Sequence, residues 1–212
     1  MYNKLQYISQ GETIEEQLRN IHQALDAGCE WVQMRFKNQT DKNRFALAEA
    51  VKLLCDEYQA VFIVNDDLHL AKQIDADGVH LGLTDTKIEE ARAFLGSSKI
   101  IGGTANTFED IQDHVKNGCD YIGLGPFRFT VTKEKLSPIL GLSGYFEILQ
   151  KLKKIKIEIP VYAIGGITLR DINPLMDTGI YGIAVSGIIT ESDEKEKLIQ
   201  QLKEKLYANV IV

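Results

Sequence analysis

The chain has 212 residues with 24 basic and 30 acidic side chains, which gives a formal net charge of −6. Its basic residues are scattered apart from a short lysine run within residues 151–156, and this argues against a nucleic-acid surface, because phosphate-backbone binding needs a concentrated basic face. The hydrophobic share of 44% supports a sizeable core, and no linker rich in proline, glycine or serine divides the chain, so we expect a single domain over residues 1–212.

The three cysteines, Cys29, Cys55 and Cys119, are far apart and form no Cys-x-x-Cys pair. An odd number of separate cysteines without a signal peptide predicts reduced, buried thiols in a cytoplasmic protein and argues against structural zinc. No apolar run approaches the ~20 residues that a membrane span needs, so we expect no membrane partner.

The first predicted strand covers residues 5–9, and the capping-box pattern Thr-Ile-Glu-Glu at residues 13–16 opens a helix that ends at residues 27–28. A second strand over residues 31–35 precedes a helix over residues 41–58, where apolar residues recur at helical spacing. The alternation continues with strands over residues 61–64, 78–81, 100–103, 121–125, 161–164 and 182–185. The matching helices cover residues 68–73, 88–95, 107–117, 145–154 and 193–206, with a short helix starting at residues 168–171.

Eight strands that alternate with helices imply right-handed parallel crossovers, so the predicted fold is an α/β (β/α)₈ barrel. An open doubly wound sheet is the alternative. Such a sheet seldom has eight even units, and it usually carries a glycine fingerprint after its first strand. The first predicted strand leads instead into Gln10-Gly11-Glu12, which is no fingerprint.

Residues 61–85 organise the expected site, because two apolar strands in this stretch are each followed by a carboxylate. Asp66 and Asp85 would lie at the same C-terminal edge, where a barrel places its active site. Together they could hold a divalent metal, which would suggest a phosphate-bearing substrate. Alternatively, each acid simply starts the following helix, because Asp is a good N-cap. These two residues alone leave both interpretations open.

Polar residues at other strand ends favour a metal-bound diphosphate. Gln33, Arg35 and Lys37 alternate in an extended segment and would share one face, where Arg and Lys suit a diphosphate. A polar barrel mouth is the alternative interpretation for these three residues. His80 lies inside the fourth strand, and a buried, hydrogen-bonded histidine is the favoured interpretation unless a ligand reaches the upper layer of the barrel.

The last strand ends predict a second anion site. The long loop over residues 125–144 carries two threonines and a lysine, which offer two hydroxyls and a cation. Strand seven ends in Gly165-Gly166 and strand eight in Ser186-Gly187, an arrangement that barrels use for phosphate, although tight turns need glycine too. No serine, cysteine or histidine is placed as a nucleophile. The implied chemistry is displacement of diphosphate by a phosphorylated nucleophile.

Six segments of the chain resemble the thiamine phosphate synthase family. They are VQMRFK at 32–37, IVNDDLHLAKQIDADGVHLGLTD at 63–85, IGGTANTFED at 101–110, DYIGLGPFRFTVTK at 120–133, IPVYAIGGI at 159–167 and GIAVSG at 182–187. The resemblance implies a (β/α)₈ barrel with Mg²⁺ as cofactor. It also implies that 4-amino-5-hydroxymethyl-2-methylpyrimidine diphosphate loses diphosphate, and that the nitrogen of 4-methyl-5-(β-hydroxyethyl)thiazole phosphate captures the resulting cation to give thiamine phosphate.

The resemblance also implies roles for individual residues. Asp66 and Asp85 would bind Mg²⁺, and Gln33 and His80 would contact the pyrimidine. The diphosphate would be held by Arg35, Lys37, Asn65, Thr104 and Lys133, of which Arg35, Lys37 and Lys133 would be catalytic. The thiazole phosphate would be held by Thr130, Thr132, Gly166, Val185 and Ser186.

Five residues depart from the usual family pattern, namely Leu83, Thr104, Asn106, Arg128 and Phe129, although Thr104 retains the hydroxyl of the usual serine. Arg128 would add a cation beside the expected thiazole phosphate site, and Phe129 replaces a rigid proline. The related thiazole tautomerases share the barrel but carry a histidine where Asn106 stands, so the residues favour the synthase. A non-catalytic barrel that binds thiamine phosphate is a third hypothesis. The only partners expected are small-molecule substrates, and a homo-oligomer stays open.

Overall fold

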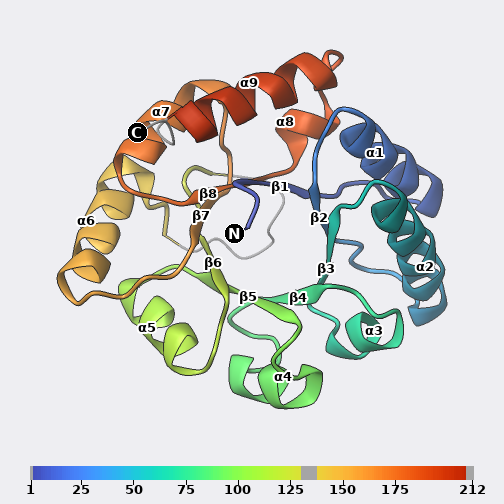
Figure 1. Cartoon of the computed structure of the whole chain (residues 1–212), viewed down its shortest axis with the longest axis horizontal. Helices are drawn as coiled ribbons and strands as arrows, with labels where there is room; N and C mark the ends of the chain where they lie inside the picture. The colour runs from blue at the N-terminus through green and yellow to red at the C-terminus, as the bar shows by residue number, and fades with distance from the viewer. Residues whose placement is uncertain (1, 130–137, 209–212) are drawn as a thin grey trace.

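The computed structural model describes residues 2–129 and 138–208, and its strands form one closed parallel barrel in the order β1 to β8 (Figure 1). β8 pairs with β1 and closes the ring, with Leu5 opposite Ile183 and Tyr7 opposite Val185. The (β/α)₈ barrel predicted from the sequence is therefore confirmed. The strand bounds are β1 Leu5–Ile8, β2 Trp31–Met34, β3 Val61–Asn65, β4 Gly78–Leu81, β5 Ile100–Ala105, β6 Tyr121–Leu124, β7 Val161–Ile164 and β8 Gly182–Val185.

The helices form an outer ring around the strands (Figure 1). They are α1 Ile14–Asp26, α2 Asp41–Glu57, α3 Leu68–Gln73, α4 Ile88–Leu95, α5 Phe108–Lys116, α6 Gly141–Lys154, α7 Ile172–Asp177, α8 Gly187–Thr190 and α9 Lys195–Tyr207, with a 3₁₀ helix η1 at Leu169–Asp171. Most bounds agree with the sequence prediction to within two residues, and two features differ more. α6 begins at Gly141 instead of residue 145, and α8 was not expected, because four residues are too few to show a helical hydrophobic period.

Aromatic side chains fill the N-terminal half of the barrel interior. Trp31 and Tyr121 meet edge to face with their ring centroids 5.1 Å apart, and Tyr162 packs against them at 5.2 Å and 5.5 Å. Tyr2 packs on Trp31 with a centroid distance of 5.5 Å, in keeping with the N-terminus at the centre of the strand ring (Figure 1). Because this end is filled, ligand-binding groups are left to the C-terminal rim.

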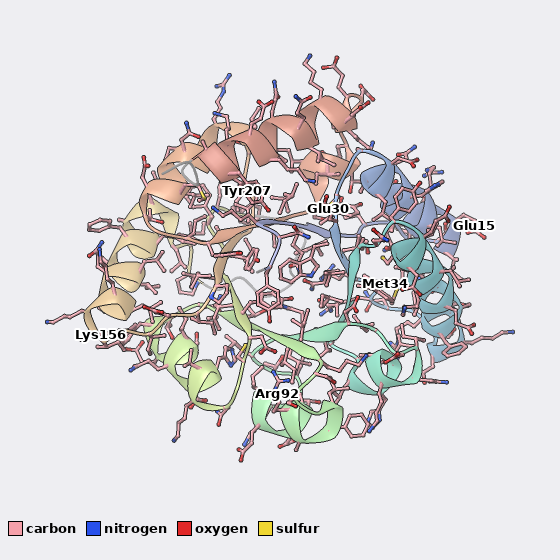
Figure 2. All side chains as sticks on the ribbon, in the orientation of Figure 1. Glu15, Glu30, Met34, Arg92, Lys156 and Tyr207 are labelled. Atoms are coloured by element: carbon pink, nitrogen blue, oxygen red, sulfur yellow. The ribbon has the colours of Figure 1, made fainter. Side chains whose placement is uncertain are left out.

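The main hydrophobic core lies between the strands and the helices. Met34 of β2 and Leu47 and Val51 of α2 belong to it and are buried. Glu15 and Lys156, in contrast, lie on the outer surface, and Figure 2 shows both at the periphery of the molecule. Burial of this apolar layer drives the packing of each helix onto the barrel and so fixes where each strand end lies.

The three cysteines are free thiols, with Cys29 and Cys55 buried and Cys119 partly buried. Burial raises the pKa of Cys29 to about 11 and that of Cys55 to about 12. These thiols are therefore protonated and unreactive at neutral pH. Within residues 2–129 and 138–208, no helix has the length and apolar character needed to cross a bilayer.

Candidate active site

The two carboxylates expected to form the site lie at the C-terminal ends of neighbouring strands. Asp66 follows β3, and its backbone N–H donates to the carbonyl of His80 in β4 at 2.8 Å. Its carboxylate forms an ion pair with Lys37, with Nζ 2.8 Å from Oδ2. Asp85 lies in the loop after β4, where its Oδ2 accepts the N–H of Gly82 at 2.6 Å. A Cβ at Gly82 would lie only 2.7 Å from Asp85 Oδ2, so any other residue there would displace this carboxylate.

Neither of these carboxylates caps a helix. α3 is capped by Asp67, whose Oδ1 accepts the N–H of Leu70 at 2.9 Å. α4 begins after Lys87, and no side chain caps it. The interpretation of Asp66 and Asp85 as N-caps is therefore wrong. Asp66 instead adopts a left-handed conformation with φ of 64°, which turns the chain out of β3 and places the cap role on the next residue.

The electrostatics of the pair favour the binding of a cation. Burial raises the pKa of the Asp66 carboxyl, Lys37 opposes this shift, and the Asp85 carboxylate adds to it. A carboxyl whose pKa is raised, with a second carboxylate beside it, is a favourable site for a divalent cation. Among the residues that the structure describes, no group of three or more His, Cys, Asp or Glu could hold a metal, so water or a substrate would complete the ligand set.

The polar residues after β2 approach the same rim. Gln33 is 2% exposed, and its Nε2 donates to Asn65 Oδ1 at 2.7 Å. Its Oε1 is buried and has no hydrogen-bond partner among the described residues. Arg35 and Lys37 follow the strand, and Phe36 between them is buried. A cavity of about 450 Å³ opens beside Lys37 and Asp66.

The backbone of Arg35 is fixed from two sides. Its N–H donates to Ser9 Oγ at 2.9 Å, and its carbonyl accepts from Gln17 Nε2 at 3.1 Å. Gln17 Nε2 also donates to the carbonyl of Gly11 at 3.0 Å. Ser9 and Gln17 are both buried, and neither was singled out in the sequence. Their positions were not recognisable because a single serine or glutamine leaves no periodic signal.

Below the rim, His80 belongs to a hydrogen-bonded chain inside the barrel. It is 6% exposed, with Nδ1 3.0 Å from Tyr121 Oη and Nε2 3.0 Å from Thr104 Oγ1. Gln6 Nε2 donates to the same Tyr121 oxygen at 3.2 Å. The expectation of a buried, hydrogen-bonded histidine is confirmed. The bonds on both ring nitrogens hold the imidazole in one orientation beneath the rim.

The ends of β7 and β8 form tight backbone turns. Gly165 and Gly166 have φ of 90° and 68°, a conformation that favours glycine. Ser186 follows β8, and its hydroxyl donates to the carbonyl of Ile8 at 2.6 Å, so this side chain links β8 to β1. Val185 is buried at the end of β8. β7 and β8 pair in parallel, with Ile164 opposite Ala184, so their two ends lie beside each other at the rim.

The remaining expected residues lie on two later loops. Asn106 follows β5, where its Nδ2 donates to the Gly125 carbonyl and its N–H donates to Asp110 Oδ2. Leu83 and Phe129 are exposed. Arg128 lies against Gly166 and forms an ion pair with Asp171. Thr130, Thr132 and Lys133 lie outside the described residues.

A closed (β/α)₈ barrel that gathers carboxylates, cations and glycine turns at its C-terminal rim defines an enzyme that handles phosphate-bearing substrates. Comparison with known proteins narrows this class. The chain belongs to the family described as thiamine monophosphate synthase, whose model matches residues 5–189.

Individual relatives agree with this family membership. A thiamine-phosphate synthase of Flavobacterium johnsoniae is 81% identical over 212 residues, which cover 100% of both chains. One of Flavobacterium psychrophilum is 63% identical over 97% of this chain and 100% of the relative. Among solved structures, the thiamine phosphate pyrophosphorylase of Pyrococcus furiosus is similar, with a TM-score of 0.83, 30% identity and coverage of 97% of this chain and 96% of that one.

Proposed function

We propose that the chain catalyses the transfer of a pyrimidinylmethyl group. It joins 4-amino-5-hydroxymethyl-2-methylpyrimidine diphosphate to 4-methyl-5-(β-hydroxyethyl)thiazole phosphate and releases thiamine phosphate and diphosphate. The observation that carries this proposal is the cluster of Lys37, Asp66 and Asp85 at one side of the barrel rim. A cation beside two carboxylates suits a substrate whose leaving group is a metal-bound diphosphate.

Mg²⁺ is the cofactor that fits these residues. Asp66 and Asp85 would hold it, because carboxylate oxygens are its preferred protein ligands and because two of them leave positions for diphosphate oxygens and water. When bound, the ion would supply positive charge to the departing diphosphate. The raised pKa of Asp66, caused first by burial and further by Asp85, supports this assignment, since a bound cation would stabilise the ionised carboxylate.

The basic residues stabilise the charge that develops on the leaving group. Arg35 and Lys37 would donate hydrogen bonds to the diphosphate oxygens as the carbon–oxygen bond breaks, and Lys133 would add a third cation. Asn65 and Thr104 would complete the set of diphosphate contacts. Lys37 pairs with Asp66, so a bound diphosphate and metal would rearrange this ion pair into a larger network of opposite charges.

The pyrimidine would lie over the barrel interior between Gln33 and His80. The buried Oε1 of Gln33 is a hydrogen-bond acceptor with no partner among the described residues, and the 4-amino group of the substrate is a donor that matches it. The thiazole phosphate would lie near Gly166, Val185 and Ser186, together with Thr130 and Thr132. Its ring nitrogen then forms the new carbon–nitrogen bond to the methylene carbon that diphosphate leaves.

Turnover tests this proposal directly. Purified protein given both substrates and Mg²⁺ is expected to form thiamine phosphate and to release one diphosphate for each product, as measured by chromatography and a coupled diphosphate assay. Activity on the thiazole alone that survives chelation would favour a tautomerase instead. Binding of thiamine phosphate without any turnover at micromolar enzyme would favour a non-catalytic binding protein. A cytoplasmic location and a homo-oligomeric state stay predictions.

A further inference from the structure

The segment that follows β6 lies directly against the glycine turn that follows β7. The N–H of Phe127 donates to the carbonyl of Ile164 at 2.8 Å, and the N–H of Arg128 donates to the carbonyl of Gly165 at 3.0 Å. These two bonds continue the pairing of β6 with β7 beyond the ends of both strands. The conformation of one loop therefore depends on the position of the other.

The side chain of Arg128 ties the same two loops together. Its Nη1 donates to the carbonyl of Gly166 at 2.6 Å. Nη1 and Nη2 each donate to one carboxylate oxygen of Asp171 at 2.9 Å, which is the two-point geometry that only arginine provides. The guanidinium also lies over the ring of Phe127, with Cζ 4.9 Å from the ring centroid. A planar group held in this way has little freedom to turn toward a ligand.

Asp171 fixes the other end of this contact. Its Oδ2 accepts from the backbone N–H of Thr168 at 2.8 Å and from Thr168 Oγ1 at 2.7 Å, which caps η1 shortly after the glycine turn. The Asp171 side chain is 14% exposed. Arg128 beside it, helped by Thr168, lowers the pKa of Asp171 to about 2, so the carboxylate is ionised throughout the neutral range.

The glycine turn has no space to adjust by itself. A Cβ at Gly165 would lie 2.8 Å from Cβ of Pro126, and a Cβ at Gly166 would lie 3.0 Å from Cβ of Arg128. Both glycines also have positive φ, where other residues are strained. The turn therefore owes its conformation to the residues packed against it, and Arg128 is the one that binds its backbone through a charged side chain.

We propose that Arg128 is a positioning residue that holds the Gly165–Gly166 turn in the conformation that binds the phosphate of the second substrate. This inference rests on the proposed function, in which Gly166 contacts the thiazole phosphate. Three of the five N–H donors of the guanidinium are engaged by Asp171 and the Gly166 carbonyl, so in this proposal Arg128 contacts the backbone of the turn and not the phosphate. Arg128 thus acts on affinity for one substrate through the backbone beside it.

Steady-state kinetics with each substrate varied in turn test this role in Arg128→Lys and Asp171→Asn. Each variant is expected to raise KM for the thiazole phosphate about tenfold, with KM for the pyrimidine diphosphate nearly unchanged, because only the turn after β7 is released. If Arg128 instead bound the phosphate directly, Asp171→Asn would free its guanidinium for the ligand and lower KM for the thiazole phosphate. This result would overturn the proposal.

Two control variants separate positioning from general loss of structure. Arg170→Lys makes the same chemical change at an exposed neighbour and is expected to leave both KM values unchanged. Thr168→Val removes one bond to Asp171 and retains the pair with Arg128, so it is expected to lower the melting temperature without the tenfold change in KM. An equal rise of KM in Thr168→Val would assign the effect to the cap of η1 and contradict the proposal.

Binding of thiazole phosphate alone, measured by calorimetry, gives the same comparison without turnover. Wild-type protein that binds this compound but makes no product would contradict the proposed function, while weaker binding in Asp171→Asn would still support the role of Arg128. Unchanged binding in Asp171→Asn would overturn the role of Arg128 even in an active enzyme. A wild-type protein that binds no thiazole phosphate would overturn both.

Discussion

Asp66 retains a partly buried negative charge at a cost to stability. Burial raises its pKa above the ordinary value, which means that the folded protein holds a proton on this carboxyl more tightly than the unfolded chain does. The stability that this group contributes is therefore present at low pH and is lost as pH rises through the raised pKa. A carboxylate that destabilises the protein at neutral pH is a strong candidate for a functional group.

Asp66→Asn is expected to separate stability from function. Asn tolerates the left-handed conformation of this residue and removes the buried charge, so the melting temperature of metal-free protein at pH 7 should rise. The difference from wild type should shrink as pH falls, because wild-type Asp66 then becomes neutral too. At the same time kcat should fall about a hundredfold or more, since a ligand of the metal that stabilises the leaving group is lost.

Thermal melts with chelator across pH 4 to 8 and turnover assays measure these two effects. Asp67→Asn is the matched control, because Asn can still cap α3 and the change lies one residue away. It should retain turnover. A lower melting temperature for Asp66→Asn at pH 7 would show that the ion pair with Lys37 outweighs burial, and an unchanged kcat would remove Asp66 from the metal site.

At the scale of elements, α1 connects the loop after β1 with the loop after β2 at the rim. Gln17 projects from its first turn and donates to the carbonyls of Gly11 and Arg35, which lie in the loops after β1 and β2. These bonds are largely buried, so their donor cannot be replaced by water without a local rearrangement. The helix therefore sets the backbone position from which the Arg35 side chain reaches its ligand.

Gln17→Leu is expected to weaken both the fold and one substrate site. Two carbonyls lose their donor, which should lower the free energy of unfolding by about 1–3 kcal/mol. KM for the pyrimidine diphosphate should rise, while KM for the thiazole phosphate should not, because of the two loops that lose this bond only that of Arg35 carries a proposed substrate contact. Urea unfolding and two-substrate kinetics measure this, with Gln23→Leu on the exposed face of α1 as control. A loss of stability without a change in KM would show that Ser9 suffices to position Arg35.

The elements themselves were largely predictable from the sequence, because each is encoded by local chemistry. Strands β4, β7 and β8 and helices α3 and α4 have the predicted bounds, and the other strands differ only at their C-terminal ends. The helix α8 was missed because it is shorter than two turns. The sequence could not show which of Asp66 and Asp67 caps α3, because this depends on the left-handed backbone of Asp66 and not on residue type.

At the scale of the whole molecule, the barrel topology allowed the rim residues to be predicted, but not the contacts between them. The rule that parallel strands share one C-terminal edge brings Lys37 and Asp66 together, and the structure pairs them. The ion pair of Arg128 with Asp171 joins two loops that are far apart in the sequence. Such a contact depends on the three-dimensional course of both loops, and neither composition nor periodicity encodes it.

Closure of the barrel also links ligand binding to the stability of the whole chain. Arg35, Asp66 and Asp85 come from different strand ends, so the unfolded chain has no assembled site and ligands stabilise only the folded barrel. Mg²⁺ alone has only the carboxylates of Asp66 and Asp85 as expected protein ligands, and diphosphate alone is repelled by their negative charge. Each should therefore shift the melting temperature little when added singly, while both together should bind cooperatively.

Thermal melts with Mg²⁺, diphosphate and their mixture test this cooperativity. At about a hundred times its Kd, the mixture should stabilise the barrel by about 2.7 kcal/mol, which corresponds to a rise of about 5–10 °C for a chain of this size. Asp66→Asn should abolish the extra shift of the mixture, and Asp67→Asn should retain it. An equal shift by diphosphate in the presence of chelator would mean that Arg35 and Lys37 bind it without metal, and that Asp66 and Asp85 serve another purpose.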